Sequence, residues 1–121
     1  MRRICVFCGS SAGKNDRYAT ATVDLARELA ARGLGLVYGG GRVGLMGVLA
    51  EAALAAGTEL IGVIPRDLLN QEVASLSVAD LRVVGSMHER KALMADLADG
   101  FVALPGGLGT ARTARAPWAP A

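Results

Sequence analysis

The sequence predicts a Rossmann-like α/β fold, a doubly wound parallel sheet with helices on both faces. Two observations lead to this fold class. Short β-type apolar runs alternate with helical patterns, and aromatic residues are few while Ala and Gly are many, as in α/β enzymes with tightly packed helices. Strands that alternate with helices form βαβ units and therefore a parallel sheet. Ligands of such sheets bind outside the carboxyl ends of the strands, so we expect the functional residues in the loops that follow the strands.

The chain begins with a strand and a helix. Ile4–Cys8 is an apolar run that predicts the first strand. The helix that follows extends from the N-cap candidates Asn15 and Asp16 to Arg32, and Gly33 is the expected residue that ends it. Apolar positions that recur three or four residues apart give this helix one face, at Tyr18, Thr22, Leu25 and Leu29.

The middle of the chain repeats this pattern. Leu34–Tyr38 predicts the second strand, which the glycines at 39–41 break. A second helix is expected at Leu45–Ala56, and Gly57 ends it. Leu60–Ile64 is the third predicted strand and is closed by a proline.

The last elements follow an ambiguous segment. Residues 66–80 combine a short helix with a loop, and Leu81–Val84 predicts a fourth strand. An S-x-x-E capping box that begins at Ser86 predicts a helix to about Ala98. Phe101–Leu104 is the fifth predicted strand.

Charge and composition exclude several classes of protein. The formal net charge is +2, and Arg112 and Arg115 supply all of it, because residues 1–99 hold eleven acidic and eleven basic side chains. A nucleic-acid partner would need a basic face, so none is expected. No apolar run is long enough for a membrane span or a signal peptide, so we expect a cytoplasmic protein without a membrane partner.

A glycine-rich turn follows the second predicted strand. Residues 39–44, Gly-Gly-Gly-Arg-Val-Gly, match the dinucleotide pattern G-x-G-x-x-G between a strand and a helix. An NAD site also needs an acidic residue at the carboxyl end of the next strand, but Glu59 stands at the start of that strand. NAD is therefore disfavoured. A nucleotide or phosphate site and a structural tight turn both remain open interpretations.

Two patterns near the N-terminus match known sites incompletely. Residues 9–15, Gly-Ser-Ser-Ala-Gly-Lys-Asn, are one residue short of a P-loop and lack its magnesium-binding hydroxyl, which excludes an NTPase. Ser10 either donates a hydrogen bond to a ligand or belongs to an ordinary turn. Cys5 and Cys8 lie three residues apart on a strand and point to opposite faces. We expect them to be buried small residues, and no metal site is expected.

Two later segments suit an anionic ligand. Residues 105–110, Pro-Gly-Gly-Leu-Gly-Thr, offer successive glycine N–H groups and a hydroxyl to a phosphate, or form a structural loop. Arg90 and Lys91 lie in the first turn of a helix, where the helix dipole disfavours cations. We expect them to serve an anionic ligand or a carboxylate partner. The alternative is two solvated charges partly balanced by Glu89. A lone histidine is more often a helix-surface residue than a catalyst, so no catalytic role is expected for His88.

Together these motifs resemble the Lonely Guy (LOG) family. Four motifs stand in register, at residues 8–11 (Cys-Gly-Ser-Ser), 39–47 (the glycine turn with Gly-Leu-Met-Gly), 86–91 (Ser-Met-His-Glu-Arg-Lys) and 105–110. The resemblance implies a Rossmann-like homodimer that hydrolyses the N-glycosidic bond of N6-modified AMP, and often of AMP, to free base and ribose 5-phosphate. The implied partner is thus a nucleoside 5′-monophosphate. No cofactor is implied, and nothing in the sequence supports the label lysine decarboxylase that similar sequences carry.

The resemblance also implies roles for individual residues. Arg90 matches the active-site arginine of the family, and Glu72 matches a substrate-contacting glutamate. Glycosidic cleavage passes through an oxocarbenium-like state, which needs a carboxylate near the ribose. With the loop patterns above, the expected substrate-binding residues are Gly106, Gly107, Gly109, Thr110, Lys91, Gly40, Gly41, Ser10 and Glu72.

The sequence departs from the family pattern near its end. The family motif is P-G-G-x-G-T-x-x-E, and Thr113 stands at the position of its key Glu. No acidic residue follows Asp99, and residues 111–121 are a tail rich in Ala, Arg and Pro. We expect residues 1–110 to be an incomplete Rossmann-like nucleotide-binding domain, truncated or frameshifted after Thr110, with the C-terminal part of the family fold missing. Hydrolysis would then be impaired, or the domain would bind nucleotide without catalysis.

Overall fold

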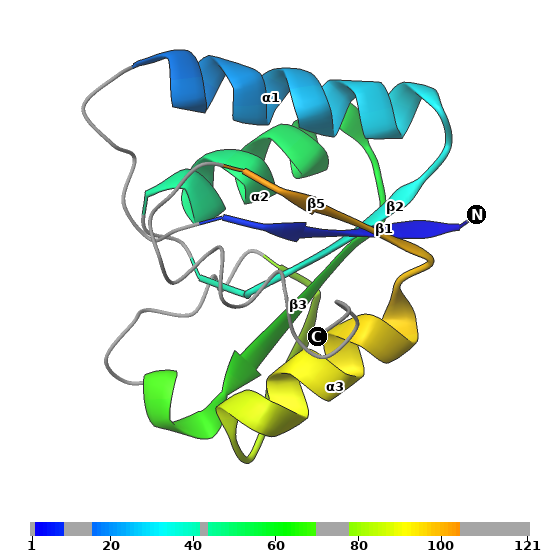
Figure 1. Cartoon of the computed structure of the whole chain (residues 1–121). Coiled ribbons are helices and arrows are strands. Elements are labelled where there is room, and N and C mark those ends of the chain that lie inside the picture. The colour runs from blue at the N-terminus through cyan, green and yellow to red at the C-terminus, as the bar shows by residue number, and fades with distance from the viewer. Residues whose placement is uncertain (1, 9–15, 42–43, 70–77, 105–121) are drawn as a thin grey trace.

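A computed structural model describes residues 2–8, 16–41, 44–69 and 78–104 of the chain (Figure 1). The described strands form one parallel sheet in the order β4-β3-β2-β1-β5. The strands are β1 (Arg3–Phe7), β2 (Gly35–Tyr38), β3 (Leu60–Pro65), β4 (Asp80–Val84) and β5 (Gly100–Ala103). The helices are α1 (Asp16–Ala31), α2 (Leu45–Ala56), α3 (Met87–Leu97) and the short 3-10 helix η1 (Arg66–Leu68). The predicted fold class is therefore confirmed, and each predicted strand and helix lies within one residue of its predicted bounds.

The direction in which successive strands are added to the sheet reverses at β1. From β1 the chain adds β2, β3 and β4 on one side, and then crosses the sheet to place β5 on the other side of β1. Helices α1 and α2 cover one face of the sheet and α3 covers the opposite face (Figure 1). The switch point of this topology lies between β1 and β5, where Phe7 pairs with Ala103 and the Leu104 N–H donates to the Phe7 carbonyl at 2.8 Å. Ligands of open α/β sheets bind outside the carboxyl ends at such a point.

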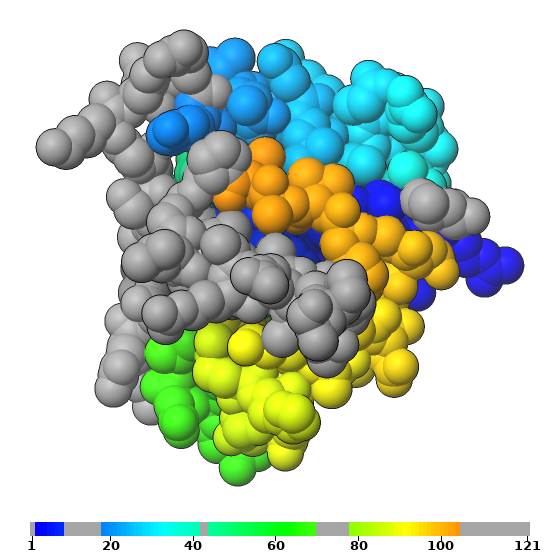
Figure 2. All heavy atoms as spheres, viewed as in Figure 1, coloured from blue at the N-terminus to red at the C-terminus, as the bar shows by residue number. Residues whose placement is uncertain are grey.

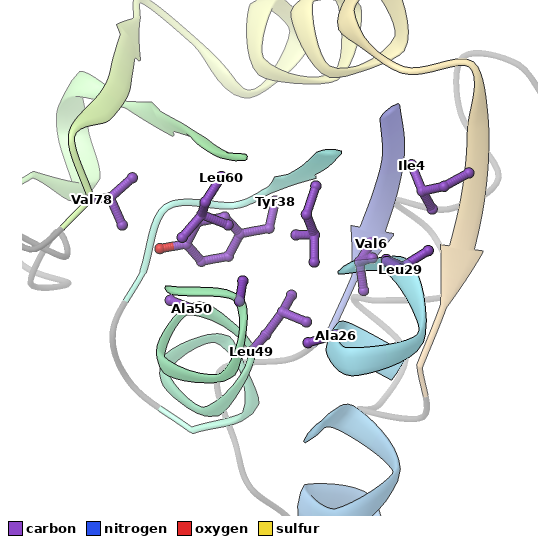
Figure 3. Close-up of a cluster of buried hydrophobic side chains, with 11 residues drawn as sticks. Ile4, Val6, Ala26, Leu29, Tyr38, Leu49, Ala50, Leu60 and Val78 are labelled. Atoms are coloured by element: carbon purple, nitrogen blue, oxygen red, sulfur yellow. The ribbon is translucent and has the colours of Figure 1, made fainter. Parts of the chain in front are cut away.

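Alternate residues of the central strands enter two different cores. One core lies between the sheet and helices α1 and α2, where Tyr38 and Leu60 point toward Leu49 and Ala50 (Figure 3). The other core lies beneath α3, around the buried Met94. Its strand residues are Cys5, Phe7, Val37, Ile61 and Val63. Because both faces are covered, β1, β2 and β3 are almost continuously apolar, as is usual for parallel sheets.

Glycine ends α2 as predicted. Gly57 adopts a left-handed φ of 74°, and its N–H and that of Thr58 donate to the Leu54 and Ala53 carbonyls at 3.2 and 3.1 Å. The left-handed region is readily open only to glycine, which explains the residue type at this position.

One detail of the predicted α1 face is wrong. Thr22 and Leu29 are buried and Leu25 packs against the core, but the Tyr18 side chain is 40% exposed. The buried stripe instead includes the small residue Ala26. The large, partly polar ring of tyrosine at this end of the helix keeps access to water.

The described part of the chain contains no helix that is long and apolar enough to cross a membrane. Of the ambiguous segment 66–80, η1 is the short helix, and residues 70–77 lie outside the described residues.

Candidate functional site

Arg90 extends from the first turn of α3 to the carboxyl ends of two strands. Its Nε donates to the carbonyl of Val63 in β3 at 2.9 Å, and its Nη2 donates to the carbonyl of Gly39, directly after β2, at 2.5 Å. The guanidinium therefore lies at the edge of the sheet where the sequence predicted the functional loops. Its third nitrogen, Nη1, lies 3.6 Å from the Met87 Sδ.

The start of α3 is fixed by the predicted capping box. The Ser86 hydroxyl accepts a hydrogen bond from the Glu89 N–H at 3.1 Å, and the Glu89 carboxylate accepts one from the Gly85 N–H at 2.7 Å. The carboxylate thus binds the residue before the cap, whereas in the usual box it binds the cap itself. Glu89 is therefore committed to the helix start and does not pair with Arg90.

The Arg90 charge has no carboxylate partner among the described residues. The ion pairs found there join Arg3 to Glu59, Arg32 to Glu28 and Arg82 to Asp80. Burial lowers the pKa of Arg90, while the nearby Cys5 and Cys8 act in the opposite direction. A partly buried positive charge without a negative counter-charge is unfavourable, and an anionic ligand would reduce this free-energy cost.

Cys5 in β1 and Cys8 directly after it pack on opposite faces of the sheet, as predicted, but only Cys5 is buried and Cys8 is partly exposed. Cys5 is buried in the core beneath α3, and Cys8 packs against the core of α1 and α2. Burial raises the pKa of each thiol to about 12, although the positive charge of Arg90 lowers both pKa values in part. Both cysteines are free, and their thiols are protonated at neutral pH. The described residues contain no group of three or more His, Cys, Asp or Glu that could hold a metal ion.

Side chains of the protein itself fill the space around the glycine turn. A Cβ at Gly40 would lie 3.0 Å from Leu81 Cδ1, and one at Gly41 would lie 2.8 Å from Met46 Cε. Gly40 also has a left-handed φ of 79°. These contacts favour the interpretation of Gly39–Gly41 as a structural turn, and substrate binding by Gly40 and Gly41 stays a prediction.

The other predicted site residues fall into two groups. Lys91 is half-buried beside Arg90, and its side chain forms no ion pair with any residue that the structure describes. Those that lie outside the described residues are Ser10, Glu72, Gly106, Gly107, Gly109, Thr110 and Thr113.

Glu59 lies at the amino ends of the strands, at the opposite end of the sheet from Arg90. It immediately precedes β3, and its carboxylate pairs with Arg3 at 2.8 Å. This contact agrees with the sequence argument against an NAD site, because Glu59 is remote from the carboxyl end of its strand.

Sequence reasoning missed the backbone partners of Arg90. The carbonyls of Gly39 and Val63 belong to segments 51 and 27 residues away from it. The only available signal was the position of these residues at the ends of predicted strands.

Comparison with known families and curated proteins gives a consistent result. The profile of a family described as possible lysine decarboxylase matches residues 46–113, more than half of the chain. A rice protein (Oryza sativa subsp. japonica) named probable cytokinin riboside 5′-monophosphate phosphoribohydrolase LOGL9 is 59% identical over 90% of this chain and 48% of its own length. The Arabidopsis thaliana enzyme LOG3, named a cytokinin riboside 5′-monophosphate phosphoribohydrolase, is 52% identical over 90% of this chain and 51% of its own length. The chain thus spans about half the length of the curated relatives it matches.

Solved structures share the fold. The molybdenum cofactor carrier protein of Chlamydomonas reinhardtii superposes with a TM-score of 0.77 and 27% identity, over 93% of this chain and 67% of the carrier. A molybdenum cofactor binding protein of Rippkaea orientalis gives a TM-score of 0.75 at 24% identity, over 93% of this chain and 68% of the other. The similarity to the Rippkaea orientalis protein shows only that the fold is shared.

Proposed function

Because this chain belongs to the Lonely Guy family, we propose that it forms the nucleotide-binding half of a phosphoribohydrolase. The proposed reaction is hydrolysis of the N-glycosidic bond of AMP or N6-substituted AMP, which yields the free base and ribose 5-phosphate. In support, the identity with relatives named as phosphoribohydrolases reaches 59%, against 27% with the molybdenum cofactor carrier.

The single observation that carries this proposal is the placement of Arg90. Its guanidinium lies at the carboxyl ends of β2 and β3 and has no carboxylate partner among the described residues. A nucleoside 5′-monophosphate supplies the negative charge that such a group favours. A guanidinium has five N–H donors, and only two are committed to backbone carbonyls. A third N–H points to the Met87 Sδ, a weak acceptor, so this group and the uncommitted N–H groups can turn to the substrate.

The proposed reaction breaks the bond between C1′ of the ribose and N9 of the base. The bonding electron pair leaves on the base, the oxygen of water bonds to C1′, and a proton from that water ends on the base. Positive charge develops on the ribose during this step, and a nearby carboxylate would stabilise it or activate the water. We propose that Gly106, Gly107, Gly109 and Thr110 hold the 5′-phosphate while Arg90 and Lys91 bind the nucleotide. Glu72 is the candidate carboxylate at the substrate.

A second candidate function is nucleotide binding without catalysis. The observation that favours it is Thr113, which replaces the glutamate of the family motif in a chain that has no acidic residue after Asp99. A hydroxyl without a basic partner does not activate water at neutral pH.

The assembly that we propose for the enzyme is a homodimer.

An assay of released base separates the two candidates. The purified chain is incubated with AMP and with an N6-substituted AMP, and base and ribose 5-phosphate are quantified by chromatography. Hydrolysis predicts both products in equal amounts, with the yield lost in Arg90→Ala. Saturable AMP binding without free base would favour the binding module, and absence of both binding and product would refute both functions.

A further inference from the structure

We infer that Gly39 is a positioning residue for Arg90, which it orients through its carbonyl oxygen and through the space left by its missing side chain. The inference deepens the proposed function and rests on it only where nucleotide affinity is concerned. The orientation of Arg90 itself can be measured independently of any ligand.

The first support is the geometry of the two hydrogen bonds. Nε of Arg90 donates to the carbonyl of Val63 and Nη2 donates to that of Gly39, so two nitrogens of one planar group are bound to segments of two neighbouring strands. Two bonds to a rigid planar group fix both its position and its plane. The bond to Gly39 is therefore needed to set the direction of the N–H groups that remain for a ligand.

The second support is steric. Gly39 is buried, and a Cβ placed on it would overlap Arg90 Nη2, with Arg90 Cζ at 3.2 Å and Met46 Sδ at 3.1 Å. Any side chain at position 39 would push the guanidinium away from the Gly39 carbonyl.

The backbone conformation does not by itself require glycine at this position. The described residues with positive φ are Gly33, Gly40, Gly44 and Gly57, and Gly39 is not one of them. Alanine can therefore adopt the backbone conformation of residue 39. The neighbours that exclude a side chain there are the guanidinium of Arg90, which a Cβ would overlap, and the more distant Met46 Sδ, so Gly39→Ala acts mainly on Arg90.

The other end of the same strand offers a matched control. Gly35 begins β2, also lacks a positive φ, and a Cβ there would lie 2.5 Å from Glu59 Oε1. Like the substitution at 39, Gly35→Ala displaces the tip of one charged side chain. The displaced group is the half-exposed Glu59 of the opposite sheet edge, far from Arg90.

Nuclear magnetic resonance of the Arg90 side chain tests the inference directly. The Nε–H that donates to Val63 is expected to give a resolved signal that exchanges slowly with water, as hydrogen-bonded N–H groups do. We expect Gly39→Ala to shift this signal and to speed its exchange by about tenfold or more, and Gly35→Ala to leave it in place. An unchanged Arg90 signal in a folded Gly39→Ala chain would overturn the inference.

Affinity for AMP supplies the second readout. Loss of one charge-assisted hydrogen bond predicts about tenfold weaker AMP binding in Gly39→Ala and unchanged binding in Gly35→Ala. In an Arg90→Lys background Gly39→Ala should have no further effect, because the guanidinium it displaces is absent. Equal losses in both backgrounds would contradict the inference. If no variant binds AMP although the Arg90 signal still shifts, the proposed function fails and the positioning role stands.

A double variant covers the case in which Gly39→Ala does not fold. Replacing Arg90 by alanine as well removes the group that the new Cβ overlaps. The double variant should then recover the circular dichroism and cooperative unfolding of Arg90→Ala alone. A double variant as unfolded as Gly39→Ala would overturn the inference, because the conflict would lie elsewhere.

Discussion

Arg90 joins segments of the chain that are far apart in sequence, so its removal should affect stability as well as ligand binding. In Arg90→Ala the carbonyls of Val63 and Gly39 lose a charged donor in a partly buried place. We expect the free energy of unfolding to fall by about 2–4 kcal/mol, as measured by urea denaturation. His88→Ala, at an exposed position of the same turn, should change it by less than about 0.5 kcal/mol. Equal effects of the two substitutions would show that the backbone contacts of Arg90 do not stabilise the fold.

The thiols of the buried Cys5 and the partly buried Cys8 should make the folded chain less stable in alkali. Their pKa is about 12 in the folded protein and 9.0 ordinarily. Between these values the unfolded chain loses protons that the folded chain keeps, so the free energy of unfolding falls as pH rises. Each thiol contributes a slope of up to about 1.4 kcal/mol per pH unit in this window and none below it.

This expectation can be tested by denaturation under reducing conditions across the alkaline range. Combined Cys5→Ala and Cys8→Ala substitutions should flatten the dependence of unfolding free energy on pH above about pH 9, whatever their effect on stability at neutral pH. The difference between the two slopes is diagnostic, because the two proteins differ only at the cysteines. Identical slopes would mean that the thiols are not buried as described.

Among the elements, α3 depends most clearly on a local signal. Its N-cap hydroxyl accepts the Glu89 N–H, and the carboxylate of Glu89 closes the box at Gly85. Ser86→Ala should lower the free energy of unfolding by about 1 kcal/mol, whereas Ser86→Asp, which keeps an acceptor, should retain most of it. Because α3 carries Arg90, AMP affinity should fall with the alanine variant and not with aspartate. Indistinguishable alanine and aspartate variants would show that the cap does not stabilise α3.

Local signals of this kind explain how much of the fold was predictable. The capping box, the glycine at the end of α2 and the apolar runs of the strands depend on neighbouring residues, so the sequence alone located these elements. The contact of Arg90 with Gly39 could not be predicted, because it depends on how α3 crosses the sheet. The exposure of Tyr18 was missed for a related reason: periodicity gives the direction of a side chain but not the extent of the surface that covers it.

At the scale of the whole molecule, the two outer strands carry exposed apolar side chains. Val83 in β4 is 43% exposed and Phe101 in β5 is 37% exposed. In the described sheet each of these strands pairs on one side only, and Figure 2 shows β5 at the surface between α1 and α3. An outer strand that exposes apolar side chains favours association with another chain.

We therefore expect the 121-residue chain to self-associate as its concentration rises. Val83→Lys places a charge on the edge strand β4 and should reduce the apparent mass in size-exclusion chromatography with light scattering. Leu54→Lys on the exposed side of α2, away from any sheet edge, serves as the control. A single monomeric peak at all concentrations for the unmodified chain would refute this expectation.

We expect a nucleoside 5′-monophosphate to bind at the carboxyl ends of the strands, around Arg90. The decisive experiment is an AMP titration followed by amide chemical shifts. We predict saturable shifts in the segments that meet at Arg90, namely residues 39–41, 63–64 and 85–91, with little change at residues 3, 59 and 99 of the opposite edge. Absence of shifts at saturating AMP, or shifts confined to the opposite edge, would contradict it.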